Sequence, residues 1–537
     1  MSGSPERLRV RVESKRRAPA HFTIPAPTRR PGLAGSRLMR AGMIAASLQV
    51  AACQGRQELR PVRIAHESEI PPSLDPELAS VDGSVHSVLS NFYEPLVGFD
   101  RDMHIRPALA VGWSTPEDST WVLELRRRVH FHDGAVLTAA DAQQGLERAR
   151  SDPDSTGARH LGTIDRIEVM DAQHLRIRTR GPDPLLMNRL TAVLIGRQSL
   201  SADGSVRFVG TGPYQFTGWQ KGSLRARAFG GYWRGAPSIP DITFVLSAGE
   251  AGVTLFERGE LDVLRLGENL ERIRRVKGAR VISRSSIAGI YLWYDSRPST
   301  NGRANPFSDH RVREAVSVAI DRKALAHTRG ENTTPLAQLV PDGVFGHLVD
   351  LQELSHDPLE ARRLLRQAHY PNGLDAGVLS YSPGASVTTE VAQSVQSALE
   401  DVGIRVSLAT PEWRTLLALW SAGQLPLFLA TWFFESGDAT SFFVDCVETR
   451  DAHRRAGVYN PGFSSAPFDA LIEEQAGIRV EADRLKHFRK LVTEGLAELP
   501  VDPLISPGVS YALSARVSFD PRLDGQLLAF EMSLREP

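Results

Sequence analysis

The 537-residue sequence is poor in cysteine and lacks the short motifs of common catalytic centres. Its two cysteines, Cys53 and Cys446, can form at most one disulfide, which excludes a disulfide-stabilised scaffold. No G-x-S-x-G, H-E-x-x-H, Walker loop or G-x-G-x-x-G after a strand occurs, which argues against the enzyme classes that depend on them. The apolar run at 41–52 is shorter than the roughly 20 residues that a membrane-spanning helix needs.

The formal net charge is zero, but the two signs are unevenly distributed. Residues 1–52 carry a net charge of +8, with ten Lys/Arg and two Asp/Glu, and the remainder carries −8. A body of negative net charge is a poor general ligand for nucleic acid, so no nucleic-acid partner is expected. The basic head alone is also compatible with a disordered tail.

The segment before Cys53 has the pattern of an export signal. Arg37 and Arg40 precede the apolar run, and small residues lead to Cys53. Val50-Ala51-Ala52-Cys53 resembles a bacterial lipobox, with Val in place of the more usual Leu. We therefore predict a basic head plus lipoprotein signal at 1–53, lipidation of Cys53, and a polar tether at 54–61. The alternative is a buried N-terminal helix with a chance cysteine.

The length predicts at least two lobes, since single cores stop growing at roughly 250–300 residues. From 62 to 290 the chain is rich in strands and turns. Thr138, followed by Asp141, is typical of a helix N-cap, and 164–169 with 174–179 predict a hairpin.

From 291 to 500 the pattern changes to alternating helices and strands. Ser308 and Asp357 are candidate helix caps, and Gly403 is expected to end a helix over 387–402. Further elements are predicted as a strand at 404–408, a helix at 413–422, a strand at 425–431, and helices at 467–477 and 481–498. This alternation predicts a mostly parallel sheet covered by helices. Residues 504–537 return to strand-like patterning, so the tail is expected to cross back to the first lobe and leave a hinged cleft.

Two clusters are candidates for chemistry. His130 and His132, with Asp133, offer metal-ligand types, but the sequence shows no matching third ligand and the turn interpretation is favoured, so no metal site is predicted. The second cluster, 431–443, combines aromatic residues with two carboxylates and follows a buried strand. Such a strand end can bind a cationic group beside apolar surfaces, or it can be a surface loop anchored by its aromatic residues.

Taken in order, motifs over nearly all of 62–530 resemble the extracellular solute-binding proteins, family 5, of peptide and nickel ABC importers. The most specific is Leu125-Arg126-Arg127-Arg128-Val129-His130-Phe131-His132-Asp133-Gly134 with Ala140-Asp141. The others are Ser73-Leu74-Asp75-Pro76, Asn91 to Val97, Pro107 to Ala110 with Trp113, Gly210 to Tyr214, Tyr232-Trp233, Gly259 to Asp262, Arg311 to Ala315, Ala319 to Arg322, Asp357 to Leu365, Tyr459-Asn460-Pro461 and Phe468-Asp469.

The resemblance implies an α/β, two-lobed periplasmic-binding-protein-like fold (type II, cluster C) with a hinged cleft and an extra subdomain in lobe one. The expected division is lobe one at 62–95 and 206–289, an inserted subdomain at 96–205, an α/β lobe two at 290–504, and a return to lobe one at 505–537.

The resemblance also implies the roles of individual residues. Glu435, three residues after Trp432, occupies the position at which a carboxylate pairs with a peptide ammonium in relatives, where Asp is usual. Asp438 matches a second acidic position, and Trp413 matches an aromatic residue of the ligand pocket. Phe433, Asp82 and Ser84 complete the expected site, the last two from lobe one.

The same resemblance shows two departures. Dipeptide-specific relatives place a carboxylate-binding Arg just before the helix at 387–402, and 382–389 contains none, which disfavours a strict dipeptide receptor. Cys446 matches a disulfide position whose partner is missing, so a free, buried thiol is expected.

Function follows as an expectation from this resemblance. We expect a non-enzymatic, monomeric lipoprotein without cofactor, periplasmic or otherwise extracytoplasmic and anchored to a bacterial membrane. It would capture an oligopeptide or another cationic or amphipathic solute by lobe closure and deliver it to ABC permease subunits. The alternatives are a sensory or scaffold lipoprotein of the same fold and, more remotely, an enzyme such as a hydrolase.

Overall fold

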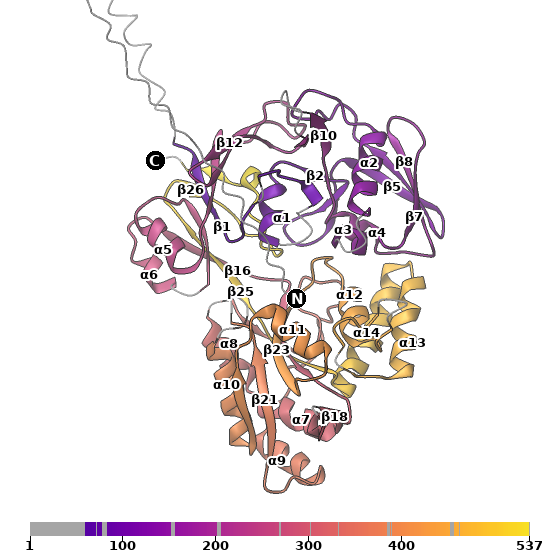
Figure 1. Cartoon of the computed structure of the whole chain (residues 1–537), viewed down its shortest axis with the longest axis vertical. Helices are drawn as coiled ribbons and strands as arrows, with labels where there is room; N and C mark the ends of the chain where they lie inside the picture. The colour runs from indigo at the N-terminus through magenta and orange to yellow at the C-terminus, as the bar shows by residue number, and fades with distance from the viewer. Residues whose placement is uncertain are drawn as a thin grey trace, which may run out of the picture. The chain divides into compact units, whose positions relative to one another are not determined.

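The computed structural model describes residues 60–70, 72–77, 83–151, 156–200, 206–267, 270–300, 302–330, 332–383, 387, 389–451, 456–460 and 462–535. Residues Arg60–Pro537 form one compact unit, in which two large sheets mark two lobes (Figure 1). The predicted signal segment, Cys53 and the tether up to residue 59 lie outside the described residues. Within the described ranges, no helix combines the length and apolar character that a membrane span requires.

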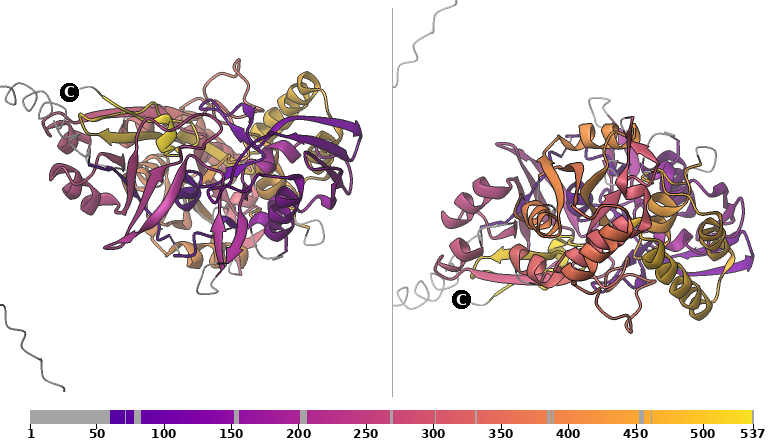
Figure 2. Two further views of the ribbon diagram at one scale, coloured as in Figure 1. Left: turned by 90° about the horizontal axis from the view of Figure 1, so that it is seen from above. Right: turned by 90° about the horizontal axis from the view of Figure 1, so that it is seen from below.

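Lobe one is built on a seven-stranded sheet of order β12-β13-β14-β1-β15-β25-β16. The central strand β1 pairs in parallel with β14 and β15, so the carboxyl ends of these three strands lie at the same edge. The C-terminal strand β25 lies between β15 and β16, and the view from above shows it in yellow among earlier strands (Figure 2). The strands are β1 Val62–His66, β12 Tyr214–Gln220, β13 Ser223–Ala228, β14 Asp241–Leu246, β15 Val263–Leu266, β16 Arg280–Ser285 and β25 Gly508–Leu513. With them lie α1 Gly83–Leu89, α5 Gly249–Glu257, α6 Leu270–Arg274, and the paired β26 Val517–Ser518 and β27 Ser533–Leu534.

A subdomain lies between β1 and β12 in the chain. Its sheet has the order β5-β6-β8-β7, and its own apolar core includes Leu123, Phe131 and Ile177. The strands are β5 Ala110–Glu117, β6 Thr120–Leu125, β7 Ile164–Val169 and β8 His174–Thr179, with the predicted hairpin confirmed as β7–β8. Helices α2 Ala139–Ala149, α3 Thr156–His160 and α4 Leu186–Leu190 accompany three strand pairs: β2 Glu94–Pro95 with β9 Leu194–Ile195, β3 Val97–Phe99 with β4 Ile105–Pro107, and β10 Arg197–Leu200 with β11 Val206–Val209.

Lobe two contains a six-stranded sheet of order β20-β24-β17-β23-β21-β22. Only β21 pairs in parallel, with β22 and with β23, whereas β17 is antiparallel to both β23 and β24. The prediction of a mostly parallel sheet is therefore wrong, because two of its strands enter and leave from lobe one instead of following a crossover helix. The strands are β17 Ala288–Tyr294, β20 Thr334–Pro335, β21 Leu374–Tyr381, β22 Ile404–Ala409, β23 Leu427–Phe433 and β24 Val501–Ser506, with a small pair β18 Ser299–Thr300 and β19 Arg303–Ala304.

Helices cover both faces of this sheet, which explains why every residue of β17 is buried. Leu292 belongs to the core beneath α7 His310–Ala319, α8 Arg322–Arg329, α9 Pro358–Gln367 and α10 Thr389–Asp401. Trp293 belongs to the core beneath α11 Trp413–Ser421, α12 Thr440–Phe442, α13 Ala466–Glu474 and α14 Glu481–Glu498. The alternation of side chains along one strand thus divides the lobe into two cores.

Local signals in the sequence explain several helix ends. Thr138 and Asp141 form a capping box on α2, Asp357 caps α9, and Gly403 ends the α10 segment at φ 92°. Ser308, predicted to cap the next helix, instead ends a short 3₁₀ turn, and Asp309 caps α7 by accepting from the Arg311 amide. The two residues are adjacent, and a charged acceptor is the stronger partner for a helix N-terminus.

The chain passes between the lobes at two adjacent points. One crossing lies at Ser286 and Ile287, between β16 and β17, and the other at Pro507, between β24 and β25. They are hydrogen-bonded to each other, since the Ser286 hydroxyl donates to the Pro507 carbonyl at 2.7 Å and the Ser506 hydroxyl donates to the Ser286 carbonyl at 3.2 Å. Ser286 and Pro507 thus mark the change from one sheet to the other, and the expected division at 289 and 504 stays a prediction.

Gly212 is expected to tolerate no side chain. Its amide donates to the Phe92 carbonyl at 2.9 Å, and a Cβ would lie 2.5 Å from that carbonyl carbon. Gly212→Ala should destabilise the protein by about 1–3 kcal/mol, because backbone rather than a flexible side chain must move. Urea unfolding measures this loss. Gly112→Ala is the matched control, since nothing lies within 4 Å of its Cβ, and equal stability of the two variants would contradict the close approach.

Candidate ligand-binding site

A cavity of about 530 Å³ is lined by residues of both lobes. Lobe one contributes the end of β1, helix α1, Arg265 of β15 and the C-terminal segment 522–531. Lobe two and the first crossing contribute Ile287, Phe433 and Glu435. A volume of this size falls within the range of about 300–1,000 Å³ that is typical of small-molecule sites.

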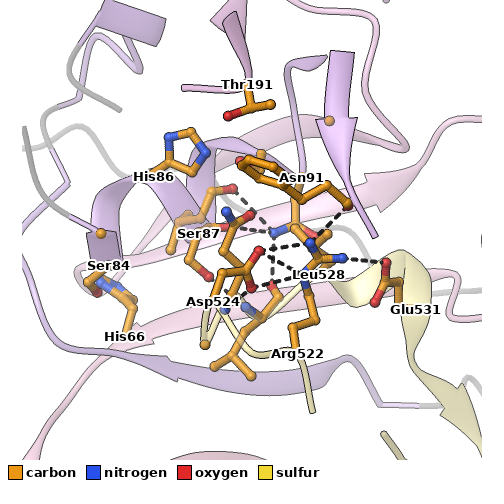
Figure 3. A pocket seen from close by; sticks show the side chains of 18 of the residues that line it. His66, Ser84, His86, Ser87, Asn91, Thr191, Arg522, Asp524, Leu528 and Glu531 are labelled. Atoms are coloured by element: carbon orange, nitrogen blue, oxygen red, sulfur yellow. Dashed lines mark hydrogen bonds and ion pairs between the residues drawn. The ribbon is translucent and has the colours of Figure 1, made fainter. Parts of the chain in front are cut away.

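The lobe-one wall is held by hydrogen bonds between α1 and the C-terminal segment. The side chain of Asn91 donates to the Leu527 carbonyl at 3.2 Å and accepts from the Ala529 amide at 2.8 Å, and the Ser87 hydroxyl accepts from the Leu527 amide at 2.7 Å. These contacts join residues more than 430 positions apart, and Figure 3 shows Asn91 and Ser87 beside Asp524 and Leu528 of the C-terminal segment. They fix the tail of the chain as part of the cavity.

Arg522 is buried in this wall with its charge compensated. Its guanidinium donates to Asp524 at 2.8 Å, to Glu531 at 3.0 Å and to the Phe99 carbonyl at 3.0 Å (Figure 3). Burial opposes the charge, but the two carboxylates outweigh it and raise the pKa of Arg522 above its usual value. Arg522 therefore joins the subdomain to the tail of the chain.

His66, at the end of β1, is a neutral member of the wall. Its Nδ1 lies 2.8 Å from the Ser68 carbonyl, which can only accept, so Nδ1 carries the proton. Burial lowers the pKa of the imidazole, and Nε2 has no hydrogen-bond partner among the described residues.

Glu94 contributes a second buried polar group. Its carboxyl group accepts from Thr211 at 2.9 Å, Tyr232 at 2.9 Å and Trp233 at 3.0 Å. Burial raises its pKa, and these donors oppose that shift. Its acceptor positions are used by the protein.

The lobe-two wall is the loop that follows β23. Phe433 is 40% exposed and Glu435 is exposed, and both line the cavity, whereas the intervening Phe434 is buried and anchors the loop. The Asn188 side chain of lobe one donates to the Ser436 carbonyl at 2.7 Å. An ion pair between the lobes joins Arg479 to Asp118 at 2.7 Å, so the structure describes the lobes in contact.

Asp438 does not face the cavity, contrary to its expected role as a second ligand carboxylate. It is 1% exposed, pairs with Arg484 at 2.8 Å and accepts from the Thr440 amide at 2.9 Å. The Arg484 guanidinium also lies 4.8 Å above the Phe345 ring. Asp438 thus fastens the loop that carries Glu435 to helix α14.

The remaining predicted residues are distributed differently. Ser84 lines the cavity, but Trp432 packs against Phe442 and Tyr459, and Trp413 is 46% exposed at the start of α11; neither tryptophan lines this cavity. Asp82 lies outside the described residues. Sequence analysis missed two parts of the cavity wall, Arg265 and the C-terminal segment. For Arg265, the available signal was an arginine at the end of a buried strand.

Two smaller expectations concern His132 and Cys446. His132 is 2.9 Å from the Gly212 carbonyl in the predicted turn region, and burial lowers the pKa of its imidazole to about 4. In the described part of the chain, no cluster of three or more metal-ligand residues occurs. Cys446 is a buried, free thiol, as expected, and burial raises its pKa.

Comparison with known proteins identifies the class. Residues 104–453 match the family model described as bacterial extracellular solute-binding proteins, family 5 Middle. The chain therefore belongs to the family-5 solute-binding proteins, which are extracytoplasmic or periplasmic, bind small ligands or peptides and work with ABC permeases. The predicted family and its two-lobed binding-protein fold are confirmed.

One relative supports the family by its sequence, and two solved structures support the fold. The glutathione-binding protein GsiB of Salmonella choleraesuis is 31% identical over 351 residues, covering 63% of this chain and 67% of the relative. The structure of HbpA2 from Haemophilus parasuis matches 89% of this chain and 100% of its own, with a TM-score of 0.75 and 21% identity. DppA from Helicobacter pylori, in complex with the peptide STSA, matches 88% of this chain and 98% of its own, with a TM-score of 0.70 and 20% identity.

Proposed function

We propose that this chain is the substrate-binding lipoprotein of an ABC importer that captures a small peptide-like solute by closing its lobes and delivers it to the permease. The observation that carries the proposal is the shared cavity, to which lobe two supplies Glu435 and Phe433 and lobe one supplies the facing wall. Glutathione, which GsiB binds, and the peptide STSA in the DppA complex both contain an amino group beside amide bonds.

Glu435 is the proposed partner of the solute ammonium group. It follows the buried strand β23, lines the cavity together with the exposed Phe433, and belongs to a loop that Asp438 and Arg484 fix from the interior. A carboxylate held in this way offers a charge-assisted hydrogen bond to an ammonium group without reorganising. The apolar ring next to it suits the body of an amphipathic solute.

Lobe closure follows from where the two walls come from. A solute that contacts both walls binds the closed arrangement better than an open one, and such a difference in affinity shifts the equilibrium toward closure. The paired crossings at Ser286 and Pro507 are the proposed hinge, because they connect the two lobes at adjacent points of the chain.

Native mass spectrometry of the purified protein tests the proposal. We expect a population with the added mass of a small, amine-containing solute, retained from the cells or from an added mixture of tripeptides. A protein that stays at its unliganded mass in both cases would count against capture. Loss of uptake of the identified solute on deleting the gene separates transport from a sensory or scaffold role.

The lipid anchor at Cys53 is part of the same proposal and has its own test. In the expression host, the mature chain is expected to begin at Cys53, carry acyl chains and sediment with membranes. Cys53→Ser should move the protein to the soluble fraction, whereas an unchanged membrane fraction would contradict lipidation. A single N-terminal anchor also fits a monomer tethered by 54–61.

A further inference from the structure

The arginines that line the cavity differ in how their charge is compensated. Arg522 has two carboxylate partners, as described above. Arg265 lines the same cavity and is half-buried. It belongs to β15, which pairs with β25 in the sheet, whereas Arg522 follows β25 in the chain. In the part of the chain that the structure describes, neither a hydrogen bond nor an ion pair reaches its guanidinium.

Arg265 lies where parallel strands end. It is the penultimate residue of β15, which pairs in parallel with β1, and it lies opposite Tyr511 of β25. The charge of Arg265 acts on the Tyr511 hydroxyl, and so do the charges of two carboxylates, Glu67 and Asp524. Neither carboxylate forms an ion pair with Arg265. Asp524 is already committed to Arg522.

An arginine in this state is an unusual part of a protein wall. A guanidinium has five N–H donors and stays charged, and partial burial without a counter-charge costs free energy that a partner would recover. Its planar fork matches a carboxylate in a two-point hydrogen bond. The neighbouring His66 imidazole is neutral, so it neither repels the Arg265 guanidinium nor supplies its counter-charge.

Arg234 is a second arginine of the cavity wall. Arg234 is exposed, its guanidinium lies 4.6 Å above the Trp233 ring, and it lines both this cavity and an adjoining hollow of about 380 Å³. Arg101 and Arg106 line that hollow as well, but Arg101 pairs with Asp520 and Glu531, and Arg106 pairs with Asp100. The cavity thus has Arg265 and Arg234 on the lobe-one side and Glu435 on the lobe-two side, whereas the charges of Arg101 and Arg106 are compensated.

We infer that Arg265 binds a carboxylate of the solute, so that the protein takes a short peptide with a free carboxylate as well as a free ammonium group. The inference rests on the proposed function and makes its solute class narrower. Residues 382–389 carry no arginine, and Arg265 supplies the anion partner from the other lobe instead.

This arrangement gives the solute charges a role in closure. Glu435 belongs to lobe two and Arg265 to lobe one, so a single solute satisfies both only when the lobes are together. A peptide lacking either charge keeps one contact and loses most of its preference for the closed state. Recognition of the solute and closure of the lobes are then the same event.

The test uses three matched pools of one tripeptide library: free peptides, their C-terminal amides and their N-acetyl derivatives. Native mass spectrometry identifies retained peptides, and calorimetry measures the affinity of the tightest one. We expect the free pool to bind, and the amide of that peptide to bind about ten- to hundredfold more weakly. Arg265→Gln should weaken the free peptide by a similar factor and leave the amide unchanged.

Two further variants control the experiment. Arg265→Lys keeps the charge without the planar fork and should recover part of the affinity. Arg166→Gln removes an exposed arginine that pairs with Glu168 in the subdomain, and it should bind like the unchanged protein.

The outcomes separate the inference from the proposed function. Amides that bind as tightly as free peptides, or an Arg265→Gln variant with full affinity for the free peptide, would overturn the anion site and leave solute capture standing. Binding of none of the three pools would overturn the peptide-like solute itself.

Discussion

Glu435→Gln is expected to weaken binding of N-terminally free peptides by about 2–5 kcal/mol, which is a loss of at least roughly thirtyfold in affinity. The substitution keeps the size and one acceptor of the side chain but removes the charge that faces the solute ammonium. Phe434, Asp438 and Arg484 anchor the loop from the protein interior, so the fold should be retained. Calorimetry with the tightest free peptide measures the loss.

Glu494→Gln provides the matched control for this prediction. It removes the same charge from an exposed position on α14, away from the cavity, and should leave the affinity unchanged. N-acetyl peptides supply an independent check, because they lack the ammonium group and should bind both forms equally weakly. Full affinity of Glu435→Gln for free peptides would remove Glu435 from the site.

Asp438→Asn is expected to lower the free energy of unfolding by about 3–5 kcal/mol. Asp438 and Arg484 have side chains that are 2% and 9% exposed, so the neutral amide leaves a buried guanidinium without its counter-charge. Chemical denaturation of the unliganded protein measures the loss. Peptide affinity should fall as well, because the loop that carries Glu435 loses its attachment to α14.

The double variant Asp438→Asn/Arg484→Met distinguishes a lost charge pair from general damage. Removing both charges should restore part of the stability, since an unpaired buried cation is no longer present. Asp483→Asn, on the same helix but with an exposed partner in Lys486, should change stability by at most about 0.5 kcal/mol. Equal losses in Asp438→Asn and Asp483→Asn would contradict the structural role of the buried pair.

Local signals in the sequence were sufficient for many elements but not for the strand order of lobe two. Thr138, Asp357 and Gly403 act within a few residues, so their caps are readable from the chain. The direction of β17 depends on β24, about 210 residues later, and on both strands crossing from lobe one. Alternation of helices and strands carries no information about such long-range pairing.

The candidate site shows the same division. Glu435, Phe433 and Ser84 line the cavity, because position after a buried strand and resemblance to relatives both depend on short segments. Asp438 is instead buried against Arg484. Whether Glu435 or Asp438 turns inward depends on α14, which the local sequence does not specify. Arg265 was missed because its significance arises from the three-dimensional structure, in which no described residue forms a hydrogen bond or ion pair with its guanidinium.

The central claim, that the lobes close on a solute with two charges, is tested most directly by a distance measured between the two lobes. Spin labels at Glu117→Cys and Val480→Cys flank the Asp118–Arg479 ion pair between the lobes, and the buried Cys446 should remain unlabelled. With Cys53 replaced by Ser, double electron–electron resonance reports the distance between the labels. We predict that the tightest free tripeptide increases the short-distance population of the labelled protein that keeps Glu435 and Arg265. The same protein with Glu435→Gln or Arg265→Gln should require more peptide for the same increase. A distance distribution that stays constant at saturating peptide would contradict capture by closure.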